Sequence, residues 1–366
     1  MKKIRLGIIF GGKSPEHEVS LQSAKNILAA LDKEKYEAVL IGIDKTGRWY
    51  LNEGSKALLN DNDPRLIQLN PSDQELALVP GSDSGQLINI ADQSSLGQID
   101  VVFPVLHGTF GEDGTVQGLL KLANIPFVGA GVLGSAVGMD KDVMKRLLKS
   151  DGIPIADFMT FGYGDRDAID FDGVTGRLGT PVFIKPANMG SSVGISKVYD
   201  RAGLEAAVEN AFQYDTKIII EENIRGRELE CSVLGNEKPI ASLPGEVLPQ
   251  AEFYSYEAKY IDEKGAILEI PAKLSKPEVK RIQKCAVLAY KSLCCEGMAR
   301  VDLFLKENGD IVVNEINTIP GFTRISMYPK LWEVSGLPYG KLIDRLIELA
   351  LERFEREQAL KTNVEI

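Results

Sequence analysis

The sequence predicts a protein that combines a parallel α/β domain with smaller α+β units, on three observations. Its 366 residues exceed one average domain of roughly 100–200 residues, so two or three domains are expected. Apolar segments at 4–10 and 38–43 flank a segment of helical periodicity, and this strand–helix–strand order indicates a parallel sheet. Further along, short strand-like segments alternate with single helices and end in a hairpin, which is typical of α+β units.

Composition excludes several classes of protein. Hydrophobic residues make up 44% and charged residues 26%, so the chain can build apolar cores and is not wholly disordered. An excess of 52 acidic over 42 basic residues gives a net charge of −10, which disfavours nucleic acid and anionic membranes as partners. An anionic substrate must therefore be held by local cations or by metal ions.

Two features bear on the cellular compartment. No segment approaches the roughly 20 apolar residues of a membrane span, and the apolar run 6–10 is too short for a signal peptide. The four cysteines form no C-x-x-C pair and are expected to be reduced. Both observations predict a cytoplasmic protein. The cysteines are Cys231, Cys285, Cys294 and Cys295.

The first part of the chain is predicted to form the parallel sheet with one polar insertion. The strand 4–10 stops at a Gly-Gly pair, and Ser14 is expected to cap a helix whose first turn holds Pro15. Residues 51–99 are rich in Asn, Asp, Ser and Gly and predict short irregular elements. The domain should close near residue 138, after strands at 38–43, 100–106 and 126–129 and a helix at 115–123.

Two smaller units are expected to follow. A helix over 139–150 ends at a Gly-Ile-Pro break, and a Gly/Ser loop over 190–194 joins two strands. Asn308-Gly309 is a strong two-residue turn and predicts a hairpin. The other elements expected are strands at 181–185, 195–198, 217–222, 227–234, 300–305 and 310–317, and helices at 204–212, 276–295 and from Tyr339 onward.

Residues 7–14 match the pattern G-x-x-x-x-G-K-[ST] of phosphate-binding loops. In such a loop the first glycine ends a strand so that free N–H groups surround phosphate, whereas Gly7 lies inside the predicted strand. Pro15 also removes an N–H group near the helix start. Two other interpretations remain: the Gly-Gly pair makes a plain tight turn, or this turn presents Glu16 to a ligand at the carboxyl edge of the sheet.

The predicted hairpin opposes two carboxylates. A two-residue turn pairs Asp302 with Glu315 and Arg300 with Asn317, and the period of two places all four on one face. Opposed carboxylates repel unless a cation lies between them, and oxygen ligands favour Mg²⁺ or Mn²⁺. A solvated sheet face that carries charges is the alternative. The opposite, core face is expected to hold Val301, Leu303, Val312 and Ile316.

A second group of residues suits a polyphosphate. Lys185 ends a strand before the loop that holds Ser191 and Ser192, and the glycines of this loop let its backbone approach phosphate oxygens. Lys141 stands at the start of the helix at the preceding domain boundary. Taken singly, each lysine is more often an ordinary surface residue, and such a loop an ordinary turn.

Two further segments have both a functional and an ordinary interpretation. Glu221 and Glu222 end a strand between the second and third units, which fits a nucleotide pocket or a charged strand exit. Residues 245–262 lack a clear period and carry Lys259 and Tyr260, which fits an active-site lid or a surface loop.

Taken together, these residues resemble the D-alanine–D-alanine ligase family of ATP-grasp enzymes. The matching motifs follow one another in family order between residues 7 and 330. They are Gly-Gly-Lys-Ser-Pro-Glu-His-Glu-Val-Ser at 11–20, His-Gly-Thr-Phe-Gly-Glu-Asp-Gly at 107–114, Met-Asp-Lys at 139–141, Lys-Pro at 185–186, the loop 190–194, Glu-Ala-Lys-Tyr at 257–260, Met-Ala-Arg-Val-Asp at 298–302 and Asn-Glu-Ile-Asn-Thr-Ile-Pro-Gly-Phe-Thr at 314–323.

The resemblance implies a three-domain ATP-grasp architecture, with an N-terminal parallel α/β domain followed by two α+β domains that clamp ATP. The expected domains are 1–138 with its insertion 51–99, then 139–225, then 226–366. The implied reaction joins two D-alanine molecules through an acyl phosphate, with ATP, for peptidoglycan synthesis. A homodimer is implied as well, and nothing is carried over to the insertion.

For the first D-alanine, the resemblance implies that Glu16 anchors the ammonium group, with Ser191 and Tyr260 as hydrogen-bond partners and His107 near by. For the second, Ser326 and Lys259 take the carboxylate. The oxyanion hole consists of Arg300 and the backbone N–H of Gly321.

The resemblance also assigns the nucleotide and the metal. Two Mg²⁺ or Mn²⁺ ions are bound by Asp302, Glu315 and Asn317. Glu221 faces the adenine amino group, and Glu228 contacts the ribose. The ATP-binding residues are Lys141, Lys185, Ser191, Ser192, Glu221, Glu222, Ile224, Glu228, Asn314 and Glu315.

Two other functions remain open. One is an ATP-grasp ligase with another acceptor, such as D-lactate. Related D-lactate ligases replace the Lys-Tyr part of the lid, so Lys259 and Tyr260 favour the dipeptide. The other is a non-catalytic nucleotide-binding regulator, in which Lys13 rather than Lys185 binds ATP.

Overall fold

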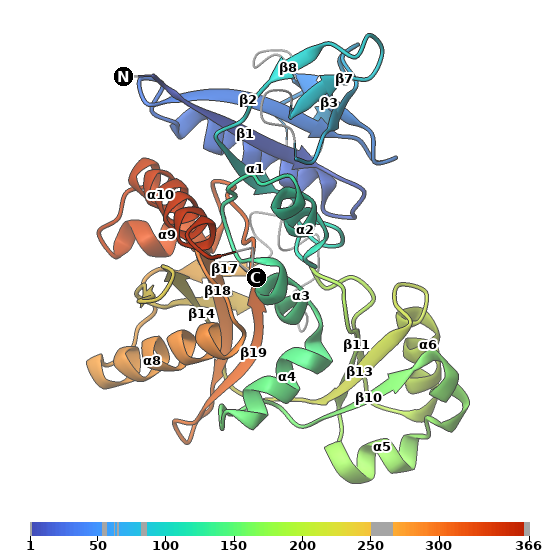
Figure 1. Ribbon diagram of the computed structural model, residues 1–366. Helices are drawn as coiled ribbons and strands as arrows, with labels where there is room; N and C mark the ends of the chain where they lie inside the picture. The colour runs from blue at the N-terminus through green and yellow to red at the C-terminus, as the bar shows by residue number, and fades with distance from the viewer. Residues whose placement is uncertain are drawn as a thin grey trace.

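The computed structural model describes residues 2–52, 57–61, 63, 66–81, 86–249 and 266–361. Its strands form main sheets of four, four and six strands and small sheets of two and three strands. Figure 1 shows the main sheets as successive units, from the blue N-terminal sheet to the orange and red C-terminal elements. The mixture of parallel and antiparallel sheets confirms the predicted α/β and α+β classes.

The N-terminal sheet has the strand order β3-β2-β1-β9, and β1 lies parallel to both β2 and β9, as predicted. Helix α1 covers one face of the sheet and buries Leu21, Ala24 and Ile27 there. The elements are β1 (Ile4–Gly11), α1 (His17–Ala30), β2 (Tyr36–Ile43), β3 (Trp49–Asn52), β9 (Val101–Val105) and α2 (Thr115–Leu122).

Gly7 lies in the middle of β1, where it pairs with Val39 on one side and Val102 on the other. The backbone of residue 7 is therefore committed to the sheet and cannot surround a phosphate. This placement excludes a phosphate-binding loop at residues 7–14. The Gly-Gly pair instead turns the chain out of β1 and delivers Glu16 to the carboxyl edge of the sheet.

Two N-terminal predictions are wrong. Helix α1 begins at His17 rather than near Ser14, because the Ser14 hydroxyl accepts the Glu16 N–H at 3.1 Å and closes a turn before the helix. The segment 126–129 is not a strand, because it meets β9 only through the bridge from Val102 to Phe127.

In its described residues the polar insertion forms short strands, as expected, and its apolar side chains complete the N-terminal cores. Leu76 and Leu87 pack with Ile43 on one side of the sheet. Ile67 and Leu69 join the cluster on the α1 side. The strands are β4 (Leu58–Leu59), β5 (Gln68–Leu69), β6 (Leu76–Leu78), β7 (Leu87–Asn89) and β8 (Ser95–Gly97).

The central sheet has the order β10-β13-β11-β12 and packs against α5 and α6. The helix predicted over 139–150 is interrupted at Asp140, which caps the second of two helices. The elements are α3 (Val132–Met139), α4 (Lys141–Ser150), β10 (Phe158–Gly162), η1 (Tyr163–Ala168), α5 (Phe171–Leu178), β11 (Val182–Pro186), β12 (Ser196–Val198), α6 (Arg201–Ala211) and β13 (Lys217–Glu222).

The C-terminal sheet has the order β17-β16-β14-β18-β19, and β15 pairs with β14. Helix α8 covers its core face, whereas α10 contacts α1 and β9 of the N-terminal unit. In Figure 1 the red α10 lies below the blue sheet. The elements are β14 (Arg227–Leu234), β15 (Ile240–Ala241), β16 (Gly245–Pro249), β17 (Ala266–Glu269), α8 (Lys276–Ser292), β18 (Met298–Leu305), β19 (Ile311–Asn317), α9 (Met327–Val334) and α10 (Tyr339–Gln358).

The hairpin β18–β19 confirms the pairs Asp302–Glu315 and Arg300–Asn317 but reaches them by another route. Its loop is longer than predicted, because the Lys306 N–H bonds the Asp310 carbonyl at 2.9 Å and leaves 307–309 as the turn. A β-bulge then inserts Asn314 between the pairs Leu303–Val313 and Asp302–Glu315, which restores the register.

The bulge also changes one predicted core residue. Val301, Leu303 and Ile316 lie in the core cluster as expected. Val312, however, pairs with Phe304 on the opposite face, and Val313 takes its place in the core. One residue of offset moves a side chain to the other face of a strand, which explains the exchange.

The cysteines form no disulfide, and of the neighbouring pair Cys294 is exposed whereas Cys295 is buried. Within the described residues, no helix has both the length and the apolar character that a membrane crossing requires.

Candidate active site

Two adjoining clefts open between the three units. The first lies between the Glu16 turn, the Gly/Ser loop and the polar face of the β18–β19 hairpin. The second lies between the central sheet and the same hairpin. They share lining residues at Ser191, Glu228, Asn314 and Glu315, so the two clefts lie side by side.

Glu16 projects into the first cleft from the turn that precedes α1, and it is only 6% exposed. Its carboxylate accepts a hydrogen bond from the Ser191 hydroxyl, which joins the N-terminal unit to the central Gly/Ser loop. A Cβ atom at Gly108 or Gly190 would lie 2.7 or 2.8 Å from Glu16 Oε2. A side chain at either position would therefore push the carboxylate out of place, and Gly108 also has a φ of +74°, which favours glycine.

Glu112 forms a second buried carboxylate on the wall of the first cleft. It accepts the Gly108 N–H at 2.7 Å and the Ile319 N–H at 3.3 Å, and so joins the end of β9 to the segment after β19. Burial, and then the nearby charge of Glu16, raise the pKa of Glu112 above its ordinary value.

His107 lies behind this wall and lines a separate apolar cavity with the Gly-Gly turn, rather than the first cleft. Its Nδ1 lies 3.0 Å from the Ile319 carbonyl and its Nε2 lies 3.2 Å from Ser23 Oγ. The Ser23 hydroxyl in turn accepts the Phe322 N–H at 3.1 Å. A neutral ring that donates from Nδ1 satisfies this whole chain, which positions the segment that carries Gly321.

Gly321 and Ser326 lie together at the end of the first cleft that adjoins α9. The Ser326 hydroxyl contacts Thr323 through the backbone N–H at 3.0 Å and the side-chain oxygen at 2.8 Å. These contacts fold the segment after β19 so that the backbone of Gly321 faces the cleft. A Cβ at Gly321 would lie 2.7 Å from Ser326 Oγ, so this close turn needs glycine.

Arg300 is the cation of the first cleft. Its guanidinium donates two hydrogen bonds of 2.7 Å to Asp302 and pairs with Glu230 at 2.9 Å. Glu230 pairs with Asp302 across β14 and β18, so two acids fix one arginine from neighbouring strands. The arrangement holds a delocalised positive charge rigidly at the cleft wall.

The same sheet face offers oxygen ligands for a cation. Asp302 and Glu315 are directly paired across β18 and β19, and Asn317 Nδ2 lies 3.2 Å from Asp302 Oδ2. No cluster of three or more His, Cys, Asp or Glu residues suited to a metal is found within the described residues. The set of two carboxylates and one amide nevertheless fits a hard divalent ion that keeps some of its water ligands. The amide of Asn317 can rotate so that its oxygen, rather than its nitrogen, faces the ion.

The second cleft contains the lysines predicted for phosphate. Lys141 Nζ donates to the Met189 carbonyl at 2.7 Å and lies 3.7 Å from Glu315. Lys185 Nζ lies 2.5 Å from Glu221 Oε2, at the centre of the sheet β10–β13. Both cations reach the cleft from the elements that the sequence predicted, a helix start and a strand end.

Glu221 is buried between two lysines, because Lys145 Nζ lies 2.9 Å from its other oxygen. Burial opposes the charge of Glu221, but Lys145 and Lys185 outweigh it and lower its pKa to about 2. Burial dominates at Lys145 and lowers its pKa despite Glu221, whereas Glu221 and Glu315 outweigh burial at Lys185 and raise its pKa. The group carries one net positive charge beside the second cleft.

The structure brings most predicted site residues together in these two clefts. Lys259 and Tyr260 lie outside the described residues, as does most of the predicted lid. The first cleft holds Glu16, Ser191, Glu228, Arg300, Asp302, Asn314, Glu315, Asn317, Gly321 and Ser326. The second holds Lys141, Lys185, Ser191, Ser192, Glu221, Glu222, Ile224, Glu228, Asn314 and Glu315.

Three further charged residues at or beside the clefts carry a signal in the sequence, although no role was predicted for them. Lys145 follows Lys141 by four residues, which places both on one face of α4. Glu230 follows Glu228 by two residues, which places both on one face of β14. Glu112 lies within the quoted motif 107–114, but no role was predicted for it.

Two family models match this chain. The model described as D-ala D-ala ligase N-terminus matches residues 5–130, and the one described as D-ala D-ala ligase C-terminus matches residues 147–348. The chain is 59% identical over 364 residues to the D-alanine–D-alanine ligase of Shouchella clausii, covering 100% of this chain and 99% of that protein. It is 54% identical over 365 residues to D-alanine–D-alanine ligase A of Escherichia coli, covering 100% of both.

Solved structures show the same fold. The D-alanine–D-alanine ligase from Coxiella burnetii has a TM-score of 0.83 and 40% identity, covering 98% of this chain and 97% of that one. The VanG D-Ala:D-Ser ligase from Enterococcus faecalis has a TM-score of 0.83 and 38% identity, covering 95% and 100%. These neighbours confirm the predicted three-part ATP-grasp architecture.

His107 predicts a pH dependence of stability. Burial lowers its pKa from 6.5 to about 4, so the unfolded chain takes up a proton first as the pH falls. The free energy of unfolding should therefore drop by about 2 kcal/mol through this residue between pH 7.5 and pH 5. Urea denaturation at the two pH values of the wild type and of a His107→Gln variant measures the effect. A His17→Gln variant should keep the drop, and an equal drop in His107→Gln would contradict the prediction.

Proposed function

The chain belongs to the D-alanine–D-alanine ligase family, and on this premise we propose that it joins two D-alanine molecules into D-alanyl-D-alanine with the consumption of ATP. The dipeptide serves peptidoglycan synthesis. One observation carries the proposal: a buried carboxylate and a fixed arginine line one cleft, and a cleft lined by two lysines adjoins it. An amino acid, an acyl transfer centre and a polyphosphate need these three features side by side.

Glu16 is the anchor for the ammonium group of the first D-alanine. Its carboxylate is buried, and the Ser191 hydroxyl orients it, so it presents a fixed negative charge at the cleft wall. We assign Tyr260 as a further partner, Lys259 and Ser326 to the carboxylate of the second D-alanine, and His107 to positioning through Ile319 rather than to direct contact.

The reaction has two displacement steps. A carboxylate oxygen of the first D-alanine attacks the γ-phosphorus of ATP, and the bond to ADP breaks. The amine of the second D-alanine then attacks the acyl carbon, loses a proton and expels phosphate. Arg300 and the Gly321 N–H stabilise the oxyanion that develops in this second step, because both line the first cleft where the acyl group lies.

The nucleotide occupies the second cleft. Lys141, Lys185 and the backbone of the Ser191–Ser192 loop hold its phosphates, since the two lysines supply the positive charge that an acidic chain otherwise lacks. Glu221 faces the adenine amino group beside Glu222 and Ile224, and Glu228 contacts the ribose. Asn314 and Glu315 stand where the two clefts meet.

Asp302, Glu315 and Asn317 are the residues that would hold two divalent ions, Mg²⁺ or Mn²⁺. Such ions, when bound, neutralise charge on the transferred phosphoryl group. Arg300 pairs with Asp302, and Lys141 and Lys185 lie near Glu315, so these cations already offset part of the charge of the cross-strand pair.

The same reasoning extends to the rest of the molecule. We assign domains of 1–138, with the insertion 51–99, then 139–225 and 226–366. The protein acts in the cytoplasm as a homodimer, and its acidic surface makes nucleic acid and membranes poor partners.

A ligase with a different acceptor is the second candidate. The structural similarity to a D-Ala:D-Ser ligase means that this fold accommodates more than one second substrate. The relatives with 54–59% identity over the full length are D-alanine–D-alanine ligases, which favours D-alanine over D-lactate here.

The activity itself is the first prediction of this proposal. ADP release should require Mg²⁺ and D-alanine and should exceed the release with L-alanine, D-serine or D-lactate as the only substrate. A coupled ADP-release assay near neutral pH, with product analysis of D-alanine and D-lactate in competition, measures this. Background ADP release in the presence of D-alanine would reject the function, and preferential D-lactate incorporation would favour the second candidate.

Replacement of Glu16 by Gln should weaken the first D-alanine site. The amide still accepts the Ser191 hydroxyl but loses the charge that holds an ammonium group, so the KM for the first D-alanine should rise about 10- to 100-fold, the effect of losing a buried charged hydrogen bond. The KM for ATP should change little. Glu18→Gln is the matched control, since Glu18 pairs with Lys45 on the outer side of α1. An unchanged KM for the first D-alanine would remove Glu16 from this role.

The double variant Asp302→Asn with Glu315→Gln should lose metal-dependent activity. Its kcat/KM should fall at least about 100-fold, the size of effect seen when transition-state charge loses its stabilisation. Activity measured across a Mg²⁺ titration, with Mn²⁺ in parallel, tests this. Glu307→Gln, in the exposed turn of the same hairpin, is the control. A Mg²⁺ dependence equal to that of the wild type would show that the ions are bound elsewhere.

A further inference from the structure

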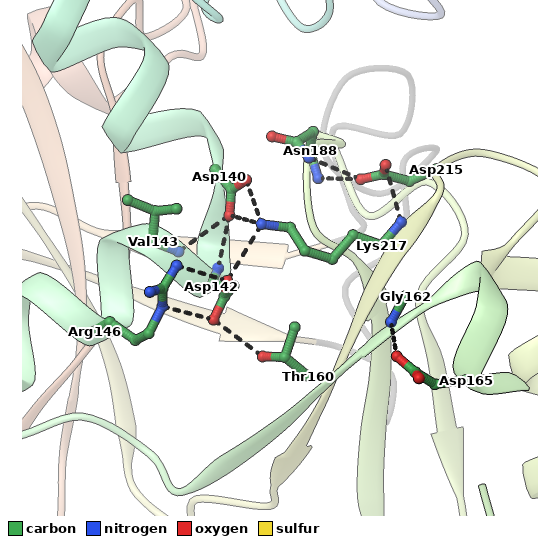
Figure 2. A network of polar contacts seen from close by, with 10 residues as sticks. All are labelled: Asp140, Asp142, Val143, Arg146, Thr160, Gly162, Asp165, Asn188, Asp215 and Lys217. Atoms are coloured by element: carbon green, nitrogen blue, oxygen red, sulfur yellow. Dashed lines mark hydrogen bonds and ion pairs between the residues drawn. The ribbon is translucent and has the colours of Figure 1, made fainter. Parts of the chain in front are cut away.

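A network of polar contacts surrounds the start of α4, outside both clefts (Figure 2). At its centre, Lys217 Nζ lies 2.8 and 2.6 Å from the two oxygens of Asp140 and 3.3 Å from Asp142. Lys217 comes from the first position of β13, and the two aspartates flank the first residue of α4. That first residue is Lys141, one of the cations of the second cleft.

Backbone hydrogen bonds close this network into a ring. The Lys141 N–H donates to the Ala187 carbonyl at 3.0 Å, and the Ala187 N–H donates to the Lys217 carbonyl at 2.9 Å. The Lys217 side chain then returns to Asp140, the residue before Lys141. The ring therefore links the start of α4, the end of β11 and the start of β13.

The base of the Gly/Ser loop is attached to the same ring. Asp215 accepts the Asn188 backbone N–H at 2.7 Å and its side-chain amide at 3.0 Å, and it also accepts the Lys217 N–H at 3.2 Å. The backbone carbonyl of Met189, the residue after Asn188, accepts a hydrogen bond of 2.7 Å from the Lys141 ammonium group. The loop that holds Ser191 and the side chain of Lys141 are thus oriented by one set of contacts.

Asp140 both caps α4 and pairs with Lys217. Its Oδ1 caps α4 by accepting the Asp142 and Val143 N–H groups at 3.1 and 3.0 Å. The carboxylates of Asp140 and Asp142 both lie within reach of one ammonium group, and Arg146 and Thr160 hold only Asp142. Removal of Lys217 leaves the capping carboxylate without its cation, so the first turn of α4 loses the group that fixes its direction.

We propose that Lys217 is a positioning residue for nucleotide binding, because its ion pair with Asp140 sets the place of Lys141 and of the loop 188–192 that grip the phosphates. Lys217, Asp140, Asp142 and Asp215 line neither cleft, so this effect passes through Lys141 and the loop. The inference rests on the proposed function of the second cleft as the phosphate site.

The test measures each substrate separately. A Lys217→Met variant should raise the KM for ATP and the Kd for Mg·ATP about tenfold, the order of effect when a group that orients a ligand-binding side chain is removed. The KM for D-alanine should rise much less than the KM for ATP, because the ring holds Lys141 and the loop base directly but reaches Glu16 only through Ser191. Lys217→Arg, which keeps the charge and can reach both aspartates, should restore most of the ATP affinity.

A second variant guards against a loss of folding. Asp140→Ser keeps a side-chain oxygen that caps α4 but removes the charge that faces Lys217. It should weaken ATP binding as Lys217→Met does. If Lys217 acts through Lys141, the effects of Lys217→Met and Lys141→Met should not add in a double-mutant cycle of ATP binding.

The control is Asp172→Asn, which breaks the exposed ion pair with Arg201 in the same unit and should leave ATP binding unchanged. Binding of Mg·ATP and of ADP, measured by calorimetry without D-alanine, separates this inference from the ligase function, since it needs no turnover. ATP affinity within twofold of the wild type in folded Lys217→Met, additive effects with Lys141→Met, or an equal rise in the KM for D-alanine would each overturn the proposal.

Discussion

The burial of one carboxylate, that of Glu16, constrains much of this molecule. The side chain is 6% exposed and packs against the backbones of Gly108 and Gly190, which come from the N-terminal and the central unit. The hydroxyl of Ser191, in the central unit, donates a hydrogen bond to one oxygen of the Glu16 carboxylate. A buried charge is stable only with such partners, so the three segments that meet at Glu16 must stay in register with one another.

The second constraint is the β18–β19 hairpin, whose irregularity serves the site. A regular hairpin places one residue of β19 on the cleft face for every two in sequence. The bulge at Asn314 lets two neighbours, Asn314 and Glu315, both line the clefts while Val313 and Ile316 remain in the core. Bulges next to functional sites redirect side chains in this way. The same strand therefore supplies apolar side chains to the core and polar side chains to the clefts.

The sequence was sufficient to predict features that depend on local spacing. The parallel N-terminal sheet, the opposed pair Asp302–Glu315 and the lysines at a helix start and a strand end all follow from periodicity and turn signals. The bulge was missed because the turn is one residue longer than predicted and the bulge adds one residue to β19. These two changes offset each other, so the predicted pair Asp302–Glu315 is still correct. The contacts of Glu221 with Lys185 and Lys145 and that of Lys217 with Asp140 were missed because they join residues 36, 76 and 77 positions apart, for which one sequence contains no signal.

The acidic composition and the anionic substrate are reconciled by where the cations lie. A net charge of −10 repels a polyphosphate at long range, but screening limits that field to roughly 10 Å in ordinary salt. Within that range the second cleft is lined by Lys141, Lys185 and Lys197, and the buried Lys145 pairs with Glu221 of the same cleft. Glu221 holds Lys185 and Lys145 charged and in place, since an unpaired lysine at the 0% exposure of the Lys145 side chain would lose its proton. The acid inside the cation cluster thus preserves the positive charge that the nucleotide needs.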